Sequence, residues 1–173
     1  EIVSTSGSST PPEVEVCDGP AGTVTPASPV LPVPDTFATP SAYYETLESM
    51  AVSYEGLVIN EYFQFGRFGE VVLAHERLVQ PTAEFEPGSP EWADAVDHVN
   101  RSRITLDDGL TPQNVDPLRH PDGGVFTESH AFRGGDTLDV EGVIYYLSGA
   151  FKIEPTGPAV HTPLNPRPNA APD

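Results

Sequence analysis

The sequence predicts an all-β fold with one or two short helices, on three observations. Twenty prolines and 15 glycines in 173 residues interrupt the chain too often for a helical protein. Short apolar alternations typical of strands recur between about residues 50 and 157, with one helical pattern between the middle strands. A hairpin pattern closes this region. Five or six strands in this arrangement favour an OB-like Greek-key barrel with an extended N-terminal arm and a proline-rich C-terminal tail.

Three parts follow along the chain. Residues 1–40 are rich in Ser, Thr, Pro and Val and predict an extended arm or linker, in which only Val14–Cys17 suits an edge strand. Residues 41–157 form the predicted barrel domain, entered through a short helix over 41–49 with Ser41 as N-cap. Residues 158–173 are proline-rich and predict a linker.

The strands of the barrel region are assigned from local patterns. Residues 50–74 read as two strands, with the FGRFG glycines placing a turn or bulge between them. RLVQPT (77–82) suggests a short strand that Pro81 ends. RITL (103–106) is a strand followed by a long loop over 109–134, and the final hairpin turns at Ser148-Gly149.

The best helix pattern lies in residues 87–103. Ser89 suits the N-cap, Pro90 the first helical position, and Glu91 the first turn. One apolar face is expected to comprise Trp92, Ala95, Val96 and Val99.

The chain carries a net charge of −18, and this charge is uneven. Residues 1–60 hold eight acids and no base, whereas residues 61–173 hold eighteen acids and all eight bases. Such a chain repels polyanions, so any anion-binding patch is expected in the second part. Cys17 is the lone cysteine, and no apolar run reaches membrane-spanning length, so we expect a soluble protein without an internal disulfide.

Acidic residues around RITLDDG suggest a metal site, but their spacing does not match an EF-hand loop. An irregular structural Ca²⁺ site remains one interpretation; the alternative is a turn at Asp108-Gly109 with Asp107 capping backbone amides. The candidate ligands are Asp107, Asp108, Asp116 and Asp122.

The sequence contains no motif that indicates an active site. The five histidines (75, 98, 120, 130 and 161) lack zinc-ligand spacing and are interpreted as surface residues. There is no GxSxG elbow. Glu128, Ser129 and His130 are neighbours in a predicted loop, and neighbouring positions in sequence do not give the geometry of a catalytic triad. We therefore predict no catalytic residues in this chain.

Aromatic and basic residues alternate in three clusters, as they do where OB barrels stack single-stranded nucleic acid. The alternative is that the aromatics fill the barrel and the bases pair with acids. The candidate DNA- or RNA-binding residues are Tyr62, Phe65, Arg67, Arg101, Arg103 and Lys152.

An ordered series of motifs covers roughly residues 30–168: LPVPDTFATPSAYYETLESM, YEGLVINEYFQFGRFGEVVLA, RLVQPT, RITLDDG, FRGGDTLDVEGVIYYLSGAFKIEPT and NPRP. This series resembles the large bacterial extracellular nucleases of the ExeM/NucH type. One departure is Ser49-Met50, where the family has a glycine–methionine pair.

The resemblance implies a secreted, modular parent whose OB-like region precedes a catalytic domain of the endonuclease/exonuclease/phosphatase type. That domain would use Mg²⁺ or Ca²⁺/Mn²⁺ and carry GDxN and SDH motifs, neither of which occurs here. The chain is then a non-catalytic accessory domain that positions the catalytic domain or guides nucleic acid. The arm over 1–16 would be the closing strand of a preceding β domain. The alternatives are a structural interdomain module, with or without calcium, and a surface- or carbohydrate-binding domain.

Overall fold

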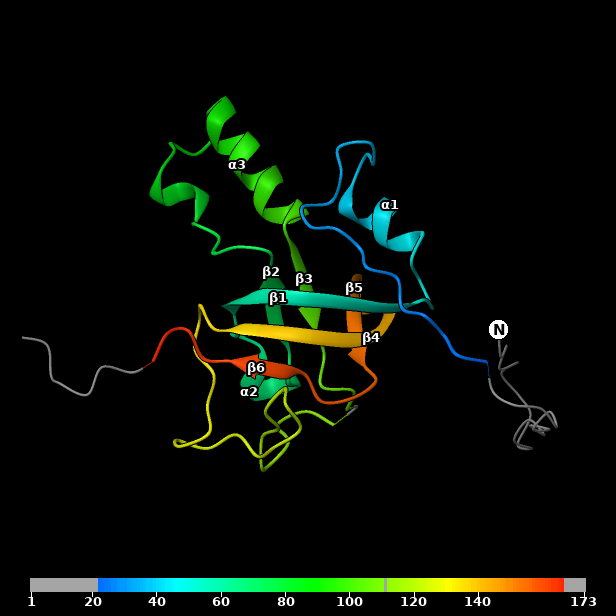
Figure 1. Cartoon of the computed structure of the whole chain (residues 1–173). Helices are drawn as coiled ribbons and strands as arrows, with labels where there is room; N and C mark the ends of the chain where they lie inside the picture. Colours follow the sequence, from blue (N-terminus) through cyan, green and yellow to red (C-terminus); the bar gives the residue numbers. More distant parts are fainter. Residues whose placement is uncertain (1–21, 111, 167–173) are drawn as a thin grey trace, which may run out of the picture.

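The computed structural model describes residues 22–110 and 112–166, and a closed barrel of five strands lies at its centre (Figure 1). The strand order is β1-β2-β3-β5-β4, and β4 pairs with β1 to close the barrel. Only β3 and β5 run parallel among these neighbours. This order confirms the predicted OB-like barrel. The strands are β1 (Ala51–Glu61), β2 (Val71–Ala74), β3 (Arg103–Leu106), β4 (Thr137–Leu147) and β5 (Ala150–Pro155).

Alternating side chains fill the barrel. In β1 the inward positions are Val52 and Tyr54, then Leu57 and Ile59, all of them buried. The change of step coincides with a register shift against β4 between Tyr54 and Leu57, where Gly56 adopts a φ of 64°. A bulge of this kind adds a residue without turning the second apolar pair outward. The core therefore continues unbroken along the longest strands.

The link between β1 and β2 contains a helical turn, α2 (Phe65–Phe68), where the sequence predicted a turn. It ends at Gly69, whose φ of 73° is the left-handed conformation that glycine adopts readily at a helix end.

The strand predicted at 77–82 is wrong. Residues 77–80 are irregular, and Pro81–Ala83 forms a short 3₁₀ turn, η1. The Asn60 side chain accepts the Leu78 N–H at 2.8 Å and donates to Glu76 O at 2.8 Å. The Asn60 side chain thus pairs with one backbone N–H of the segment and with the carbonyl of Glu76 just before it, where no strand pairs.

Two helices lie on the same side of the barrel as the figure shows it, α1 (Pro40–Glu45) and α3 (Pro90–Arg101) (Figure 1). Helix α3 lies between β2 and β3 in sequence and is capped by Ser89, which accepts the Trp92 N–H at 3.1 Å, as predicted. Its apolar face is only half-buried. In α1 the N-cap is Thr39 rather than Ser41, because Pro40 already occupies the first helical position.

The two ends of the described chain pack on the barrel. Ala27 pairs with Val52, and Val33 is fully buried, so the described part of the predicted arm packs against the barrel. The candidate strand Val14–Cys17 and the proposed closing strand over 1–16 fall outside the described residues. Residues 160–162, expected in a linker, instead form β6 (Val160–Thr162) on β4. No helix within the described ranges has the length and apolar character to cross a bilayer.

Candidate functional site

The loop between β3 and β4 brings together residues that are scattered in the sequence. Two small turns shape it, one closed by the Arg119–Val125 bridge and the other by the Thr127–His130 bridge. In the first turn, His120 N–H donates to Gly124 O at 2.8 Å. Under the loop, Phe65, Phe126 and Phe132 pack edge to face with centroids 4.9–5.3 Å apart. This aromatic base holds the two turns against the barrel.

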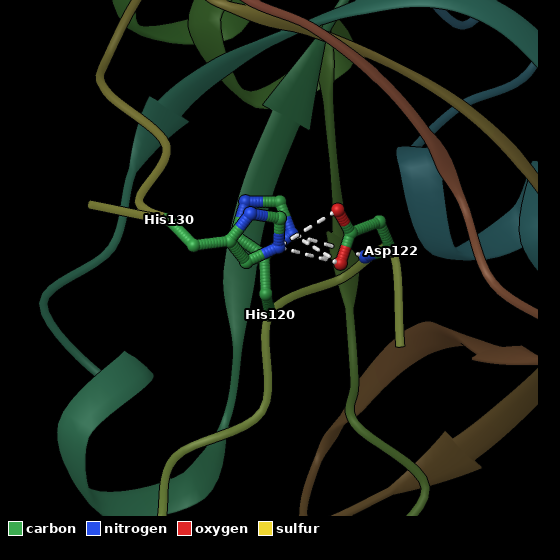
Figure 2. A group of neighbouring side chains, drawn as sticks. All are labelled: His120, Asp122 and His130. Carbon is green, nitrogen blue, oxygen red and sulfur yellow. Dashed lines mark hydrogen bonds and ion pairs between the residues drawn. The ribbon is translucent and has the colours of Figure 1, made fainter. Parts of the chain in front are cut away.

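His120 and Asp122 from the first turn meet His130 from the second; we call these three residues the loop cluster (Figure 2). His120 Nδ1 lies 2.9 Å from Asp122 Oδ1, and His130 Nε2 lies 2.9 Å from Asp122 Oδ2. One donor atom from each residue falls within 4.8 Å of the other two. In the described part of the chain, this is the only such group of three His, Cys, Asp or Glu side chains.

Burial divides the loop cluster into a fixed and an open side. The His120 side chain is 0% exposed, whereas those of Asp122 and His130 are 26% and 45% exposed. His120 stacks near Phe126 and lies edge-on to Phe132. The cluster therefore has one rigid imidazole beneath a carboxylate and a second imidazole that solvent can reach.

The electrostatics favour a neutral imidazole beside a carboxylate anion. Burial lowers the pKa of His120 and neighbouring His161 and His130 add to this, although the Asp122 carboxylate opposes it. Burial raises the pKa of Asp122, but the Gly124 N–H at 2.9 Å and the two imidazoles outweigh it, so this pKa lies below its usual value. Neutral imidazole nitrogen and carboxylate oxygen are both metal ligands.

A second carboxylate supports the loop cluster from behind. Asp136 is 2% exposed and accepts the N–H groups of Arg133 at 2.7 Å, Leu164 at 2.9 Å and Asn165 at 2.8 Å. It also contacts His161 Nε2 at 3.2 Å. The His161 ring, carried by β6, lies 4.9 Å from that of His120. Strand β6 is thereby tied to the loop.

The four aspartates proposed as calcium ligands are not gathered in one place. Asp107 is buried and contacts Tyr145 Oη at 2.6 Å and Lys152 Nζ at 3.1 Å. Asp108 accepts the Leu110 N–H at 2.9 Å, as a turn aspartate does, and Asp116 is exposed. Only Asp122 belongs to a cluster of candidate ligands, and its partners there are histidines. The turn interpretation of Asp107 and Asp108 describes their contacts better than the calcium interpretation.

The pKa of Asp107 lies below its usual value although the carboxyl group is buried. Burial raises this pKa, but hydrogen bonds from Tyr145 and Lys152 outweigh that effect and hold it below its usual value. Asp107, Asp108, His120 and Pro158 are among the residues that line a common cavity of about 280 Å³. The cavity lies between the end of β3 and the loop cluster.

The proposed nucleic-acid-binding residues do not form one surface. Phe65 is buried among Phe126 and Phe132, so its ring is not available for base stacking. Lys152 is buried between Glu70 and Asp107, which neutralise its charge. These two residues have structural roles instead.

Some of the remaining candidate nucleic-acid-binding residues already contact other parts of the protein. Arg101 is 13% exposed and pairs with Asp97 at 2.6 Å, besides donating to two backbone carbonyls. Arg103 donates to Asn100, and Arg67 donates to Gln113 and lies over the Phe68 ring. Tyr62 is half-exposed and packs edge-on against Phe132. Tyr62, Arg67 and Arg103 are thus the candidates whose side chains solvent reaches.

The prediction that all five histidines are surface residues is wrong for His120, which is 2% exposed. Zinc motifs with two histidines four positions apart on a helix do not describe this site, because its ligands lie on two turns of a loop. The spacing His120-x-Asp122 was the available signal in the sequence. Comparisons with known protein families, curated proteins and solved structures give no match. The resemblance to extracellular nucleases therefore stays a prediction.

Proposed function

We propose that this chain is a non-catalytic, OB-like accessory domain of a bacterial secreted nuclease, and that it positions the catalytic domain. The observation that carries the proposal is the closed barrel in the order β1-β2-β3-β5-β4, with the candidate DNA-binding bases Arg101 and Lys152 held in ion pairs. The motif series over residues 30–168 supports the nuclease parent, and the secreted location follows from that parent.

The net charge favours a domain that positions the catalytic domain over one that binds nucleic acid. A polyanion meets a chain with 26 acids and eight bases, and every phosphate contact has to overcome that field. The Phe65 ring is also buried in the core, so few of the candidate aromatic rings can stack on bases. An accessory domain that contacts another domain of the same polypeptide does not need a basic groove.

The nuclease parent is tested by reading the coding sequence downstream of this chain. A continuation into a domain with GDxN and SDH motifs supports the proposal. A continuation without them removes the nuclease assignment, whatever this domain binds.

The positioning role is tested by fluorescence anisotropy with labelled single-stranded DNA, duplex DNA and RNA at low salt. We expect no saturable binding at tens of micromolar protein. Saturable binding that Arg67→Ala and Tyr62→Ala weaken, and that Glu91→Ala does not, would replace positioning by substrate guiding. A glycan array distinguishes the remaining alternative, a carbohydrate-binding domain.

A further inference from the structure

We propose that His120, Asp122 and His130 form a binding site for a divalent transition metal, with Zn²⁺ as the best-fitting ion. The site is independent of the nuclease assignment. It differs from the calcium site suggested by the sequence in both ligands and metal, since only Asp122 is shared. Its ligands come from two turns of the loop between β3 and β4 (Figure 2).

The donor set selects the class of metal. Calcium and magnesium prefer six or more oxygen ligands, whereas two imidazoles and one carboxylate suit zinc and its neighbours in the first row. Three protein ligands with a fourth position for water is a common zinc arrangement. The exposed fractions of Asp122 and His130 leave that fourth position open to solvent.

The distances suit a small ion. Zinc–nitrogen bonds of about 2.0–2.1 Å place tetrahedral ligand atoms about 3.3 Å apart. Asp122 Oδ1 lies 2.9 Å from His120 Nδ1 and 3.1 Å from His130 Nε2, and one ligand atom from each of the three residues lies within 4.8 Å of the other two. Separating these atoms by a few tenths of an ångström is within reach of His130, which is the exposed member.

Without a cation, His120 is poorly satisfied. Its Nδ1 faces both the Asp122 N–H at 3.2 Å and the Asp122 carboxylate at 2.9 Å, which require opposite protonation states. Its Nε2 is buried with no hydrogen-bond partner within the described residues. No tautomer therefore pairs both ring nitrogens, and a cation at Nδ1 addresses the conflict at that nitrogen alone. A cation shared by the Nδ1 lone pair and the carboxylate converts their repulsion into two ligand bonds.

The ligands are already held in place. Asp122 Oδ1 accepts the Gly124 N–H, and the His120 ring is packed between Phe126, Phe132 and His161. A bound ion would join the turn at 119–125 to the turn at 127–130. The role we infer is therefore structural: the ion ties the two turns of the loop to each other.

The test uses the untagged full chain, stripped with a chelator and titrated with Zn²⁺ by calorimetry and by thermal unfolding. We expect one equivalent to bind. When free Zn²⁺ is 100-fold above the dissociation constant, the folded-to-unfolded ratio should rise about 100-fold. Ca²⁺ at the same concentration should leave the unfolding temperature unchanged.

His130→Ala is the decisive variant, because His130 is exposed and its loss should not prevent folding. Removing one ligand should weaken Zn²⁺ binding at least about 100-fold, since even supporting residues around a metal are worth 10–100-fold. His98→Ala is the matched control and should change nothing. Co²⁺ adds a second readout, a visible absorption typical of four-coordinate cobalt that His130→Ala abolishes. Absence of Zn²⁺ binding, or binding that His130→Ala leaves intact, overturns the site.

Discussion

Two groups of two histidines and one carboxylate can be compared in the described part of the chain, and they differ in burial and in geometry. The loop cluster has one buried histidine, and the rings of His120 and His130 lie 4.5 Å apart. The other group, which we call the surface cluster, consists of His75, Glu76 and His98. Their side chains are 34%, 50% and 50% exposed, and the two histidine rings lie 6.4 Å apart.

The difference shows that residue type alone does not make a site. In the surface cluster both histidines approach the same oxygen, Glu76 Oε1, at 3.5 and 3.0 Å. In the loop cluster His120 Nδ1 lies 2.9 Å from Asp122 Oδ1, His130 Nε2 lies 3.1 and 2.9 Å from the two carboxylate oxygens, and a backbone N–H fixes the carboxylate. Exposed pairs of long side chains give up most of their attraction to solvent and to side-chain entropy. A packed imidazole and a hydrogen-bonded carboxylate are already ordered and partly shielded from solvent, so binding an ion costs them little side-chain entropy.

The largest expected effect comes from removing the carboxylate behind the loop cluster. Asp136→Ala leaves three backbone N–H groups and His161 without their acceptor in a buried position. We expect a loss of about 3–5 kcal/mol in the free energy of unfolding, measured with urea at neutral pH. Glu76→Ala, in the surface cluster, should cost at most about 0.5 kcal/mol. Equal costs would erase the distinction between the two clusters.

Acid should weaken the loop through the same residue. Burial raises the pKa of Asp136, but the three N–H groups and His161 outweigh it, so the folded-state pKa lies below the usual value. A depressed carboxylate pKa stabilises the fold above the unfolded pKa of about 3.9, and this contribution is lost as pH falls through the folded pKa. Urea midpoints of the wild type should therefore fall with acid below about pH 5. Asp136→Asn should start lower and fall less steeply; parallel curves would contradict this assignment.

Much of the barrel could be predicted from the sequence because its signals are local. The strand at 103–106, the turn at Ser148-Gly149 and the capped helix from Pro90 each depend on neighbours within a few positions. The strand expected at 77–82 failed for a different reason. The side chain of Asn60, which is distant in sequence, bonds to Leu78 N–H and Glu76 O, and residues 77–80 pair with no strand.

The loop cluster could not be predicted in the same way. His120 and His130 are ten positions apart, and only the fold of two successive turns brings them to one carboxylate. The His120 ring packs against Phe126 and Phe132 of the same loop and also against His161, which strand β6 brings from a later part of the chain. Lys152 was likewise predicted to bind nucleic acid, but in the structure its ammonium group pairs with Glu70 and Asp107. The sequence shows which residues are charged, but it does not show which of them form ion pairs in the fold.

Crowding the loop cluster without touching its ligands should have an intermediate effect. A Cβ at Gly124 would lie 3.0 Å from His130 Nε2 and 3.1 Å from Asp122 Oδ1. Gly124→Ala should therefore push His130 away and weaken Zn²⁺ binding about tenfold by calorimetry, a cost of about 1.4 kcal/mol. Gly66→Ala is the control, because a Cβ there meets nothing within 4 Å. Unchanged Zn²⁺ binding in Gly124→Ala would mean that the ion lies elsewhere.

The smallest effect is expected in the surface cluster. The double variant His75→Ala/His98→Ala removes two imidazoles that share one exposed oxygen, so the free energy of unfolding should change by no more than about 0.5 kcal/mol. Zn²⁺ should still bind with one equivalent and the same affinity in calorimetry, because the loop cluster is intact. A fall from two equivalents in the wild type to one in the double variant would show that the surface cluster also holds an ion. In that case the pairing of residue types, rather than burial and an anchored carboxylate, would be what makes a metal site in this protein.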